Sequence, residues 1–199
     1  RVFAAKGSGT VGTGTLVGGT LQNDQLVSIE PGGHSARVRT IQTAGNTVEQ
    51  IGAGNRVAVN LAGVDHTDVK RGDAVIEPGR WRLTERFDAS LRVLDALDHD
   101  VSRRGAYVAY IGAGEHAVKL RVLGVQELGP GTTGAVRLFL PAALPLLPGD
   151  RFVLRESGRD ETVGGGEVLD IDPVLRASRA APDRSVERLV RERGWLTVD

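Results

Sequence analysis

The chain has 199 residues, and its 25 Lys and Arg side chains balance its 25 Asp and Glu side chains, so the formal net charge is zero. This balance argues against a strongly basic nucleic-acid-binding protein, although the local distribution of charge decides that question. The absence of cysteine excludes a disulfide framework and a thiolate metal site, and no apolar run approaches the roughly 20 residues that cross a bilayer, so we expect no membrane partner.

Glycine is frequent, with 27 residues, and it separates short runs of Val, Leu, Ile and Thr. Short alternating runs between turn residues predict β-strands. In the first half of the chain the predicted strands are 10–16, 26–30, 37–43, 56–61 and 74–77. No stretch there keeps a capped helical period.

A second series of predicted strands follows the turn at Pro78-Gly79. These strands are 87–94, 106–111, 117–123, 134–140, 151–155 and 161–171. The prolines that begin at Pro141 are expected to end the fourth of them, because proline cannot donate to a sheet ladder. Many short strands at this spacing are typical of barrels. We therefore expect an all-β fold of two consecutive β-barrels, residues 1–80 and 81–171.

The composition changes over residues 172–199, where Ala, Arg and Ser are frequent at first. Apolar residues then recur at helical spacing before a stop at Gly194, which predicts a short helix over 185–193. This tail is either a docked terminal helix or, as we favour, a linker and the start of a further domain. The chain also contains no methionine, with which a natural reading frame starts, so we expect a fragment of a longer protein.

The glycines near the start match a nucleotide motif only in part. Residues 7–12, GSGTVG, fit the dinucleotide fingerprint G-x-G-x-x-G. That site needs a helix opening at the third glycine, whereas residues 13–16 continue as β-branched alternation. The P-loop pattern fails as well, because Thr15-Leu16 stand where Lys and Ser or Thr are required. We interpret these glycines as bends in a barrel strand, which is compatible with close approach of a ligand to the backbone.

Two acidic clusters that contain histidine, at 65–68 and 95–100, superficially resemble metal-ligand groups. Both lie in polar stretches between predicted strands, where solvated loops are the common outcome, so no metal site is predicted. No Ser or Thr has the context of a nucleophile elbow. We therefore expect no enzyme activity and no cofactor in this chain by itself.

Residues 1–16, RVFAAKGSGTVGTGTL, resemble the opening of the second domain of translational GTPases, whose pattern is a Phe followed by K-G-x-G-T-V-x-T-G. Together with RVRTIQ at 37–42, this form is most similar to the selenocysteine-specific elongation factors. The other matching segments are GNRVAVNLAGV at 54–64, KRGD at 70–73, GDRFVLR at 149–155, TVGGGEV at 162–168 and the tail at 185–196, which is similar to the start of a winged-helix domain.

This resemblance implies that the two barrels are the second and third domains of such a factor and hold selenocysteyl-tRNA for delivery to the ribosome during UGA recoding. It also implies a cytoplasmic parent GTPase, with GTP and Mg²⁺ in an upstream domain and an mRNA hairpin bound by downstream winged-helix domains. Three alternatives remain. The chain could come from a general or paralogous translational GTPase that binds other aminoacyl-tRNAs, it could be a non-catalytic protein-interaction β-barrel, or it could be a β-barrel enzyme domain, for which no catalytic set is present.

The resemblance also implies roles for residues of the first barrel. By position, Phe3 and Arg56 would lie at the aminoacyl pocket, and Gly7, Val11 and Gln42 would line a pocket for the terminal adenosine. Glycine suits position 7, since a residue without Cβ lets a flat base approach the strand. Plain barrel core is an equally good interpretation of Phe3 and Val11.

Arg56 carries the sharpest hypothesis, because the resemblance places arginine there only in the selenocysteine-specific factors. A selenol loses its proton at lower pH than a thiol, so a selenocysteyl ester presents an anion. A fixed guanidinium favours this anion over the neutral hydroxyl of a seryl ester. The alternative is a solvated arginine at the start of a strand.

For the acceptor and T stems of the tRNA, the resemblance points to the second barrel. Arg103 and Arg104 stand in a loop similar to the family's tRNA-contacting turn, and Arg155, Arg159 and His116 are further candidates. Contacts from Arg to phosphate make binding fall with salt, and A-form RNA is recognised largely through its backbone and shape. Each of these side chains could equally be an ordinary surface residue.

Overall fold

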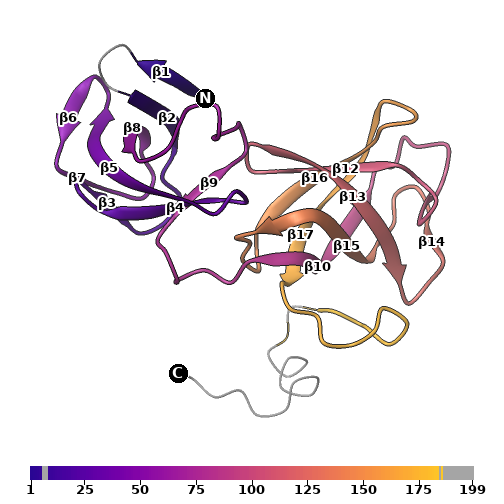
Figure 1. Ribbon diagram of the computed structural model, residues 1–199. Coiled ribbons are helices and arrows are strands. Elements are labelled where there is room, and N and C mark those ends of the chain that lie inside the picture. The colour runs from indigo at the N-terminus through magenta and orange to yellow at the C-terminus, as the bar shows by residue number, and fades with distance from the viewer. Residues whose placement is uncertain (6–8, 184, 186–199) are drawn as a thin grey trace. The chain divides into compact units, whose positions relative to one another are not determined.

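The computed structural model describes residues 1–5, 9–183 and 185, which form two compact units, Arg1–Arg82 and a second unit that begins at Leu83. Every regular element of the described residues is a β-strand, which confirms the predicted all-β class (Figure 1). In this part of the chain, no helix is long and apolar enough to span a membrane. Almost all of the predicted helix at 185–193 lies outside the described residues, and so does Gly7.

The first unit is built on a seven-stranded antiparallel sheet, with strand order β1-β2-β8-β5-β4-β9 and β6 paired to β5, beside a two-stranded ribbon of β3 and β7. The bounds are β1 (Val2–Ala5), β2 (Gly9–Thr15), β3 (Thr20–Gln22), β4 (Leu26–Glu30), β5 (His34–Thr43), β6 (Asn46–Val48), β7 (Gln50–Gly52), β8 (Arg56–Ala62) and β9 (Ala74–Ile76).

Alternation along the strands of the first unit directs one set of side chains into a single core. Val27, Ile29, Val38 and Ile41 are fully or almost fully buried there, while most of their neighbours in sequence are more exposed. The ladder in the described residues runs from β1 to β9 without returning to its start. The predicted first barrel therefore takes the form of a sheet that curves around its core (Figure 1).

The second unit is a closed barrel with strand order β10-β15-β13-β12-β16-β17, and it carries a separate ribbon of β11 and β14. The bounds are β10 (Thr84–Val93), β11 (Val101–Ser102), β12 (Tyr107–Ile111), β13 (Gly114–Leu123), β14 (Glu127–Leu128), β15 (Thr133–Leu144), β16 (Arg151–Glu156) and β17 (Glu161–Asp170). Its core includes an edge-to-face pair, Phe87 and Phe152, whose ring centroids are 6.0 Å apart. Here the predicted barrel closure is confirmed.

Strand β15 continues through Pro141 to Leu144, so the expectation that this proline ends the strand was wrong. The ladder with β13 ends at the pair of Lys119 and Phe139, before the proline. The ladder with β10 shifts register between Thr84 and Arg86, which leaves Pro141 inside a bulge. A bulge tolerates proline because no ladder hydrogen bond needs its missing N–H.

Barrel closure depends on a run of three glycines in β17. A Cβ at Gly166 would collide with the carbonyl oxygen of Ser90 and with the ring of Phe152, and a Cβ at Gly164 would collide with the backbone of Arg92. These glycines let β17 approach β10 closely while the Phe152 ring fills the space above them.

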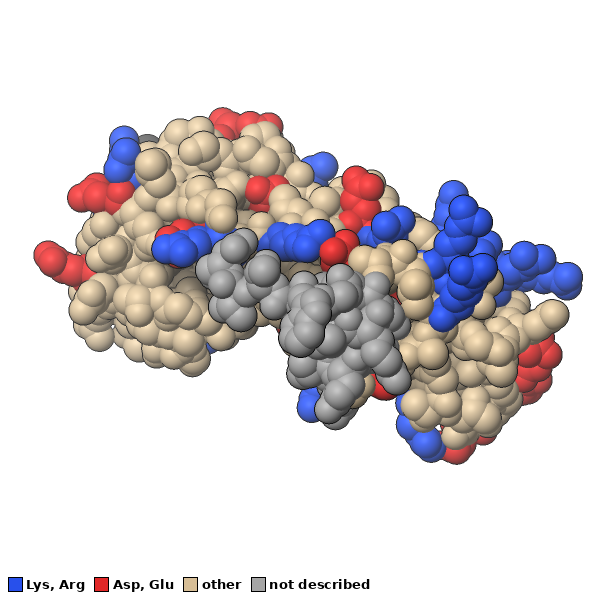
Figure 2. Space-filling model, turned by 90° about the horizontal axis from the view of Figure 1, so that it is seen from below, with Lys and Arg blue, Asp and Glu red and all other residues tan. Residues whose placement is uncertain are grey.

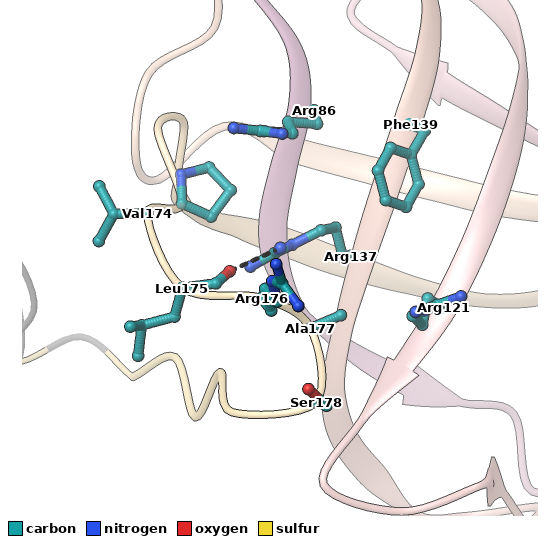
Figure 3. A pocket seen from close by; sticks show the side chains of 10 residues that line it. Arg86, Arg121, Arg137, Phe139, Val174, Leu175, Arg176, Ala177 and Ser178 are labelled. Atoms are coloured by element: carbon teal, nitrogen blue, oxygen red, sulfur yellow. Dashed lines mark hydrogen bonds between the residues drawn. The ribbon is translucent and has the colours of Figure 1, made fainter.

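The segment after β17 turns back onto the barrel. Arg137 of β15 donates a hydrogen bond from Nη1 to the carbonyl oxygen of Leu175, at 2.8 Å. Figure 3 shows this bond in the middle of a group of side chains contributed by the strands and by residues 173–178. The sequence alone did not predict this docking.

Candidate functional site

The outer face of the sheet in the first unit gathers four of the five residues predicted for an aminoacyl end. Phe3 pairs with Val11 across β1 and β2, Val11 pairs with Asn60 of β8, and Asn60 pairs with Thr40 of β5. The residues that alternate with Asn60 along β8 are buried, so this row lies on the opposite, outward face. Phe3 is 47% exposed and Val11 is half-buried outside the core cluster, so neither is plain barrel core.

Gln42 and Arg56 lie on the same face, in the next two rows. Gln42 pairs with Ala58, and Arg56 begins β8 opposite Thr15. Both predicted residues are exposed. The structure thus brings Phe3, Val11, Gln42 and Arg56 onto one surface of a single sheet, although they are distributed over more than 50 residues of sequence.

Arg56 forms hydrogen bonds with two threonines but no ion pair with a described carboxylate. Its Nη1 donates to Oγ1 of Thr15 at 3.3 Å, and its carbonyl oxygen accepts from Oγ1 of Thr43 at 2.9 Å. Among the residues that the structure describes, no acidic side chain forms an ion pair with it. The guanidinium is therefore an exposed cation whose charge is not neutralised by these residues.

Asn60 lies at the centre of this face and was missed by the sequence reasoning. Its Oδ1 is buried and has no hydrogen-bond partner in the described part of the chain. An unsatisfied buried acceptor is unfavourable by roughly 1–3 kcal/mol, so its retention needs a reason. The sequence could have indicated Asn60, because it lies four positions after Arg56 in the same strand and residues an even number of positions apart share a face.

In the second unit, Arg103 and Arg104 form the exposed turn between β11 and β12. The backbone N–H of Ser102 donates to the hydroxyl of Tyr107 at 3.1 Å, beneath the turn. Burial, above all, raises the pKa of that hydroxyl. A Cβ at Gly105 would collide with the Tyr107 ring, so this glycine lets the turn close over it.

Arg155 and Arg159 belong to the β16–β17 hairpin, next to that turn. Ser157 of the hairpin donates its backbone N–H to the carbonyl oxygen of Ala106 at 2.8 Å, which joins the two loops. Both hairpin arginines have acidic partners, whereas Arg103 and Arg104 have none among the residues that the structure describes. Arg155 Nη2 lies 2.8 Å from Oδ1 of Asp160, and Arg159 lies 3.8 Å from Glu156 and 3.9 Å from Asp98.

His116 does not join this group. It is half-buried in β13 and shares the parity of Val118 and Leu120, which are buried in the core. The structure therefore brings four of the five predicted stem residues to a turn and the neighbouring hairpin, and leaves His116 on a strand face directed toward the core.

A network around His99 supports the same hairpin. Its Nε2 lies 3.0 Å from Glu156 and 3.6 Å from Glu161, and its Nδ1 lies 3.1 Å from Asp98. The hydrogen bond with Asp98, with a further contribution from Glu156, raises the pKa of His99 against the opposing effect of burial. The potential metal-ligand atoms of His99, Glu156 and Glu161 lie within 4.8 Å of one another, a grouping that can hold a metal ion. Because Arg159 already approaches Glu156, we interpret the grouping as an ion-pair network.

Comparison with known proteins relates both units to one group of translation factors. Residues 88–174 match the family model described as "Selenocysteine-specific elongation factor, beta-barrel domain". The chain is 33% identical over 170 residues to a selenocysteine-specific elongation factor of Desulfomicrobium baculatum, which covers 85% of this chain and 27% of the relative. It is 31% identical over 180 residues to the factor of Haemophilus influenzae, which covers 90% of this chain and 28% of that one.

A general factor is also similar. Elongation factor Tu 2 of Streptomyces avermitilis is 32% identical over 182 residues, covering 86% of this chain and 45% of that protein. Among solved structures, a bacterial selenocysteine-specific elongation factor, EF-Sec, matches with a TM-score of 0.72 and 28% identity over 87% of this chain and 27% of that chain. The chain thus spans about a quarter of the length of the selenocysteine-specific relatives.

Proposed function

Because the chain belongs to the selenocysteine-specific elongation factors, we propose that its two units bind selenocysteyl-tRNA, which the parent protein carries to the ribosome for UGA recoding. On this proposal, residues 1–80 receive the aminoacylated 3′ end and residues 81–171 contact the acceptor and T stems. Residues 172–199 lead into a winged-helix region.

The observation that carries the proposal is the shared outer face in the first unit. Phe3 offers an apolar surface, Gln42 offers an amide, and Arg56 offers a cation without an acidic partner in the described chain. A terminal adenosine esterified with a side chain that carries negative charge presents matching groups, namely a flat base, a ribose and an anion. Amide side chains bind adenine edges well, and planar guanidinium groups bind anions.

Discrimination between selenocysteine and serine follows from protonation. The selenol of the esterified residue is ionised at neutral pH, whereas the serine hydroxyl is neutral. Arg56 is exposed in the chain alone, so the aminoacyl end itself must cover the guanidinium to strengthen this attraction. A seryl ester would then cover a cation without neutralising it, which adds a penalty to the wrong ligand.

On this proposal, GTP, Mg²⁺ and an mRNA hairpin are bound by other domains of the parent protein. The glycines of β2 do not fit a phosphate-binding loop, since a strand continues through Thr13 and Thr15 and no lysine follows. We therefore assign GTP hydrolysis with its Mg²⁺ to a domain outside this chain, and mRNA-hairpin binding to winged-helix domains beyond it. The parent is then a cytoplasmic GTPase, and this chain is its non-catalytic tRNA-binding part.

The test compares the affinity of the chain for selenocysteyl-tRNA with its affinity for seryl-tRNA of the same sequence. Arg56→Ala is expected to weaken binding of selenocysteyl-tRNA by about tenfold and to leave seryl-tRNA nearly unchanged. Arg71→Ala is the matched control, because Arg71 is an exposed arginine of the same unit in the turn before β9 and belongs to none of the strands that form the face. An unchanged ratio in the Arg56 variant would remove Arg56 from the specificity mechanism.

The similarity to elongation factor Tu 2 favours one alternative, a region that binds aminoacyl-tRNAs in general. The same measurement separates the two functions. Equal affinity of the unmodified chain for selenocysteyl-, seryl- and alanyl-tRNA would support the general function. Absence of any salt-dependent tRNA binding would instead support a protein-interaction barrel.

A further inference from the structure

The second unit has a groove that none of the roles above uses. It has a volume of about 340 Å³ and lies between the outer faces of β10, β13 and β15 and the segment 173–178. Figure 3 shows Arg137 at its centre, with Phe139 and Arg121 on the side of the strands and Leu175 on the side of the segment. The docked segment therefore forms one wall of the groove.

The charges that line the groove are all positive. Its lining includes Arg86, Arg121, Arg137 and Arg176 and contains no Asp or Glu. Arg137 is already paired with Asp88. The guanidinium groups of the other three form no hydrogen bond or ion pair with any residue that the structure describes. Several unpaired cations around one depression repel each other, and a bound anion relieves that repulsion.

An exposed aromatic ring lies among these cations. Phe139 is 37% exposed, and it pairs with Arg86 of β10 on one side and with Lys119 of β13 on the other. A simple anion-binding site gains nothing from a phenyl ring. A ligand that has phosphate groups linked by apolar sugar surfaces uses both kinds of side chain.

The groove continues toward the turn predicted to contact the tRNA stem. Arg121 also lines a second cavity, of about 250 Å³, whose lining includes Arg103 and again contains no acidic residue. Figure 2 shows Lys and Arg side chains of the second unit gathered in a dense group, with few acidic side chains among them. A basic path thus connects the turn at Arg103 to the groove at Arg176 through one shared side chain.

We propose that this path binds the ribose–phosphate backbone of RNA, with Arg86, Arg121 and Arg176 on phosphate groups and Phe139 against a ribose. The proposal rests on the function proposed above and extends it, because it carries the RNA beyond the turn to the docked segment. Guanidinium groups match phosphate oxygens in geometry, and contacts of this kind fix the position of a helix without reading its sequence. An acidic protein surface is the competing partner, and it would leave Phe139 unused.

The experiment measures the affinity of the chain for a 12-base-pair RNA hairpin without an amino acid, as a function of KCl concentration. Arg121→Gln is expected to weaken binding about tenfold and to reduce the slope of log K against log salt by about 1, since it removes one phosphate contact. Arg86→Gln and Arg176→Gln should each reduce the slope similarly. Arg151→Gln is the control, because Arg151 is exposed in the same unit and lines neither cavity.

Phe139 gives an independent readout. Phe139→Ala is expected to weaken hairpin binding without changing the salt slope, because it removes an uncharged contact. Circular dichroism and the unfolding midpoint show that each variant is folded. If the three arginine variants bind the hairpin like Arg151→Gln, the groove proposal is overturned while the tRNA function stands. If the unmodified chain binds neither the hairpin nor aminoacyl-tRNA, both proposals fall. If the three arginine variants lose binding to a poly-glutamate peptide but still bind the hairpin, the groove binds an acidic protein surface and not RNA.

Discussion

Asp88 and Arg137 form a buried, two-point ion pair between neighbouring strands of the closed barrel. Arg137 Nε lies 2.6 Å from Oδ1 of Asp88, Arg137 Nη2 lies 2.9 Å from Oδ2, and the side chains are 5% and 2% exposed. The remaining nitrogen of Arg137 bonds to the carbonyl oxygen of Leu175. The Arg137 side chain therefore connects β15 both to Asp88 of β10 and to the docked segment.

The first prediction concerns this pair. Asp88→Ala is expected to lower the free energy of unfolding by about 3–5 kcal/mol, because it leaves the charge of Arg137 buried and unpaired. Chemical denaturation of the second unit measures the loss. The double variant Asp88→Leu with Arg137→Met should recover most of it. Asp95→Asn, which breaks the exposed pair with Arg92, serves as the control and should change stability by less than about 1 kcal/mol. A loss no larger in Asp88→Ala than in this control would contradict the prediction.

The second prediction concerns the close approach of β17 to β10. Gly166→Ala is expected to destabilise the second unit by about 3 kcal/mol or more, since its Cβ meets the carbonyl oxygen of Ser90 and the Phe152 ring. Gly158→Ala is the matched change, because nothing lies within 4 Å of a Cβ there. The comparison uses thermal unfolding of both variants. Equal melting temperatures would show that β17 can move away from β10 at little cost.

The third prediction concerns pH. The pKa of His99 is raised in the folded chain, mainly by its hydrogen bond with Asp98, so protonation of His99 stabilises the fold. This contribution is fully present below the unfolded value near 6.5 and is lost as pH rises through the higher folded value. The stability difference between the unmodified chain and His99→Gln should therefore be larger at pH 5.5 than at pH 8.5. NMR titration of the His99 ring gives the folded pKa directly, and a value at or below 6.5 would refute the assignment.

The fourth prediction concerns Asn60. Asn60→Val is expected to raise the free energy of unfolding by about 1 kcal/mol, because it replaces a buried acceptor that has no described partner with an apolar β-branched group. Gln42→Val, on the same face but exposed, should have a smaller effect. Equilibrium unfolding in urea compares them. A clear loss of stability in Asn60→Val would mean that the amide is satisfied in solution.

The sequence predicted the described strands of five or more residues, although the bounds of the longest ones differ by several residues. The predicted strand 26–30 coincides with β4, and the predicted strand 151–155 differs from β16 by one residue. Among the described strands of two to four residues, β9 was predicted. The others, such as β1, β3, β7 and β11, were missed, because so few residues carry too little periodicity. Pro141 was misjudged because the bulge that accommodates it depends on the register with β10, which is a tertiary property.

The candidate site, too, was predicted from the sequence only in part. The residues of the first unit were placed by resemblance, and their common face follows from strand parity once β8 and β2 are paired. The arginine groove was not visible in the sequence, because Arg86, Phe139 and Arg176 come from three separate segments. Only cross-strand pairing and the docking of residues 173–178 bring them together.

The bond between Arg137 and Leu175 also determines where the chain leaves the barrel. Without this bond, the segment after Asp170 would be untethered, and its maximum distance from the barrel would grow with every residue. Because Leu175 is bonded to β15, the segment is tethered at the arginine-lined groove. The five residues after Asp170, up to Leu175, would span roughly 16–18 Å when extended, and this length no longer adds to the distance that the chain can extend from the barrel. The described residues that follow Leu175 therefore begin beside the RNA path that we propose.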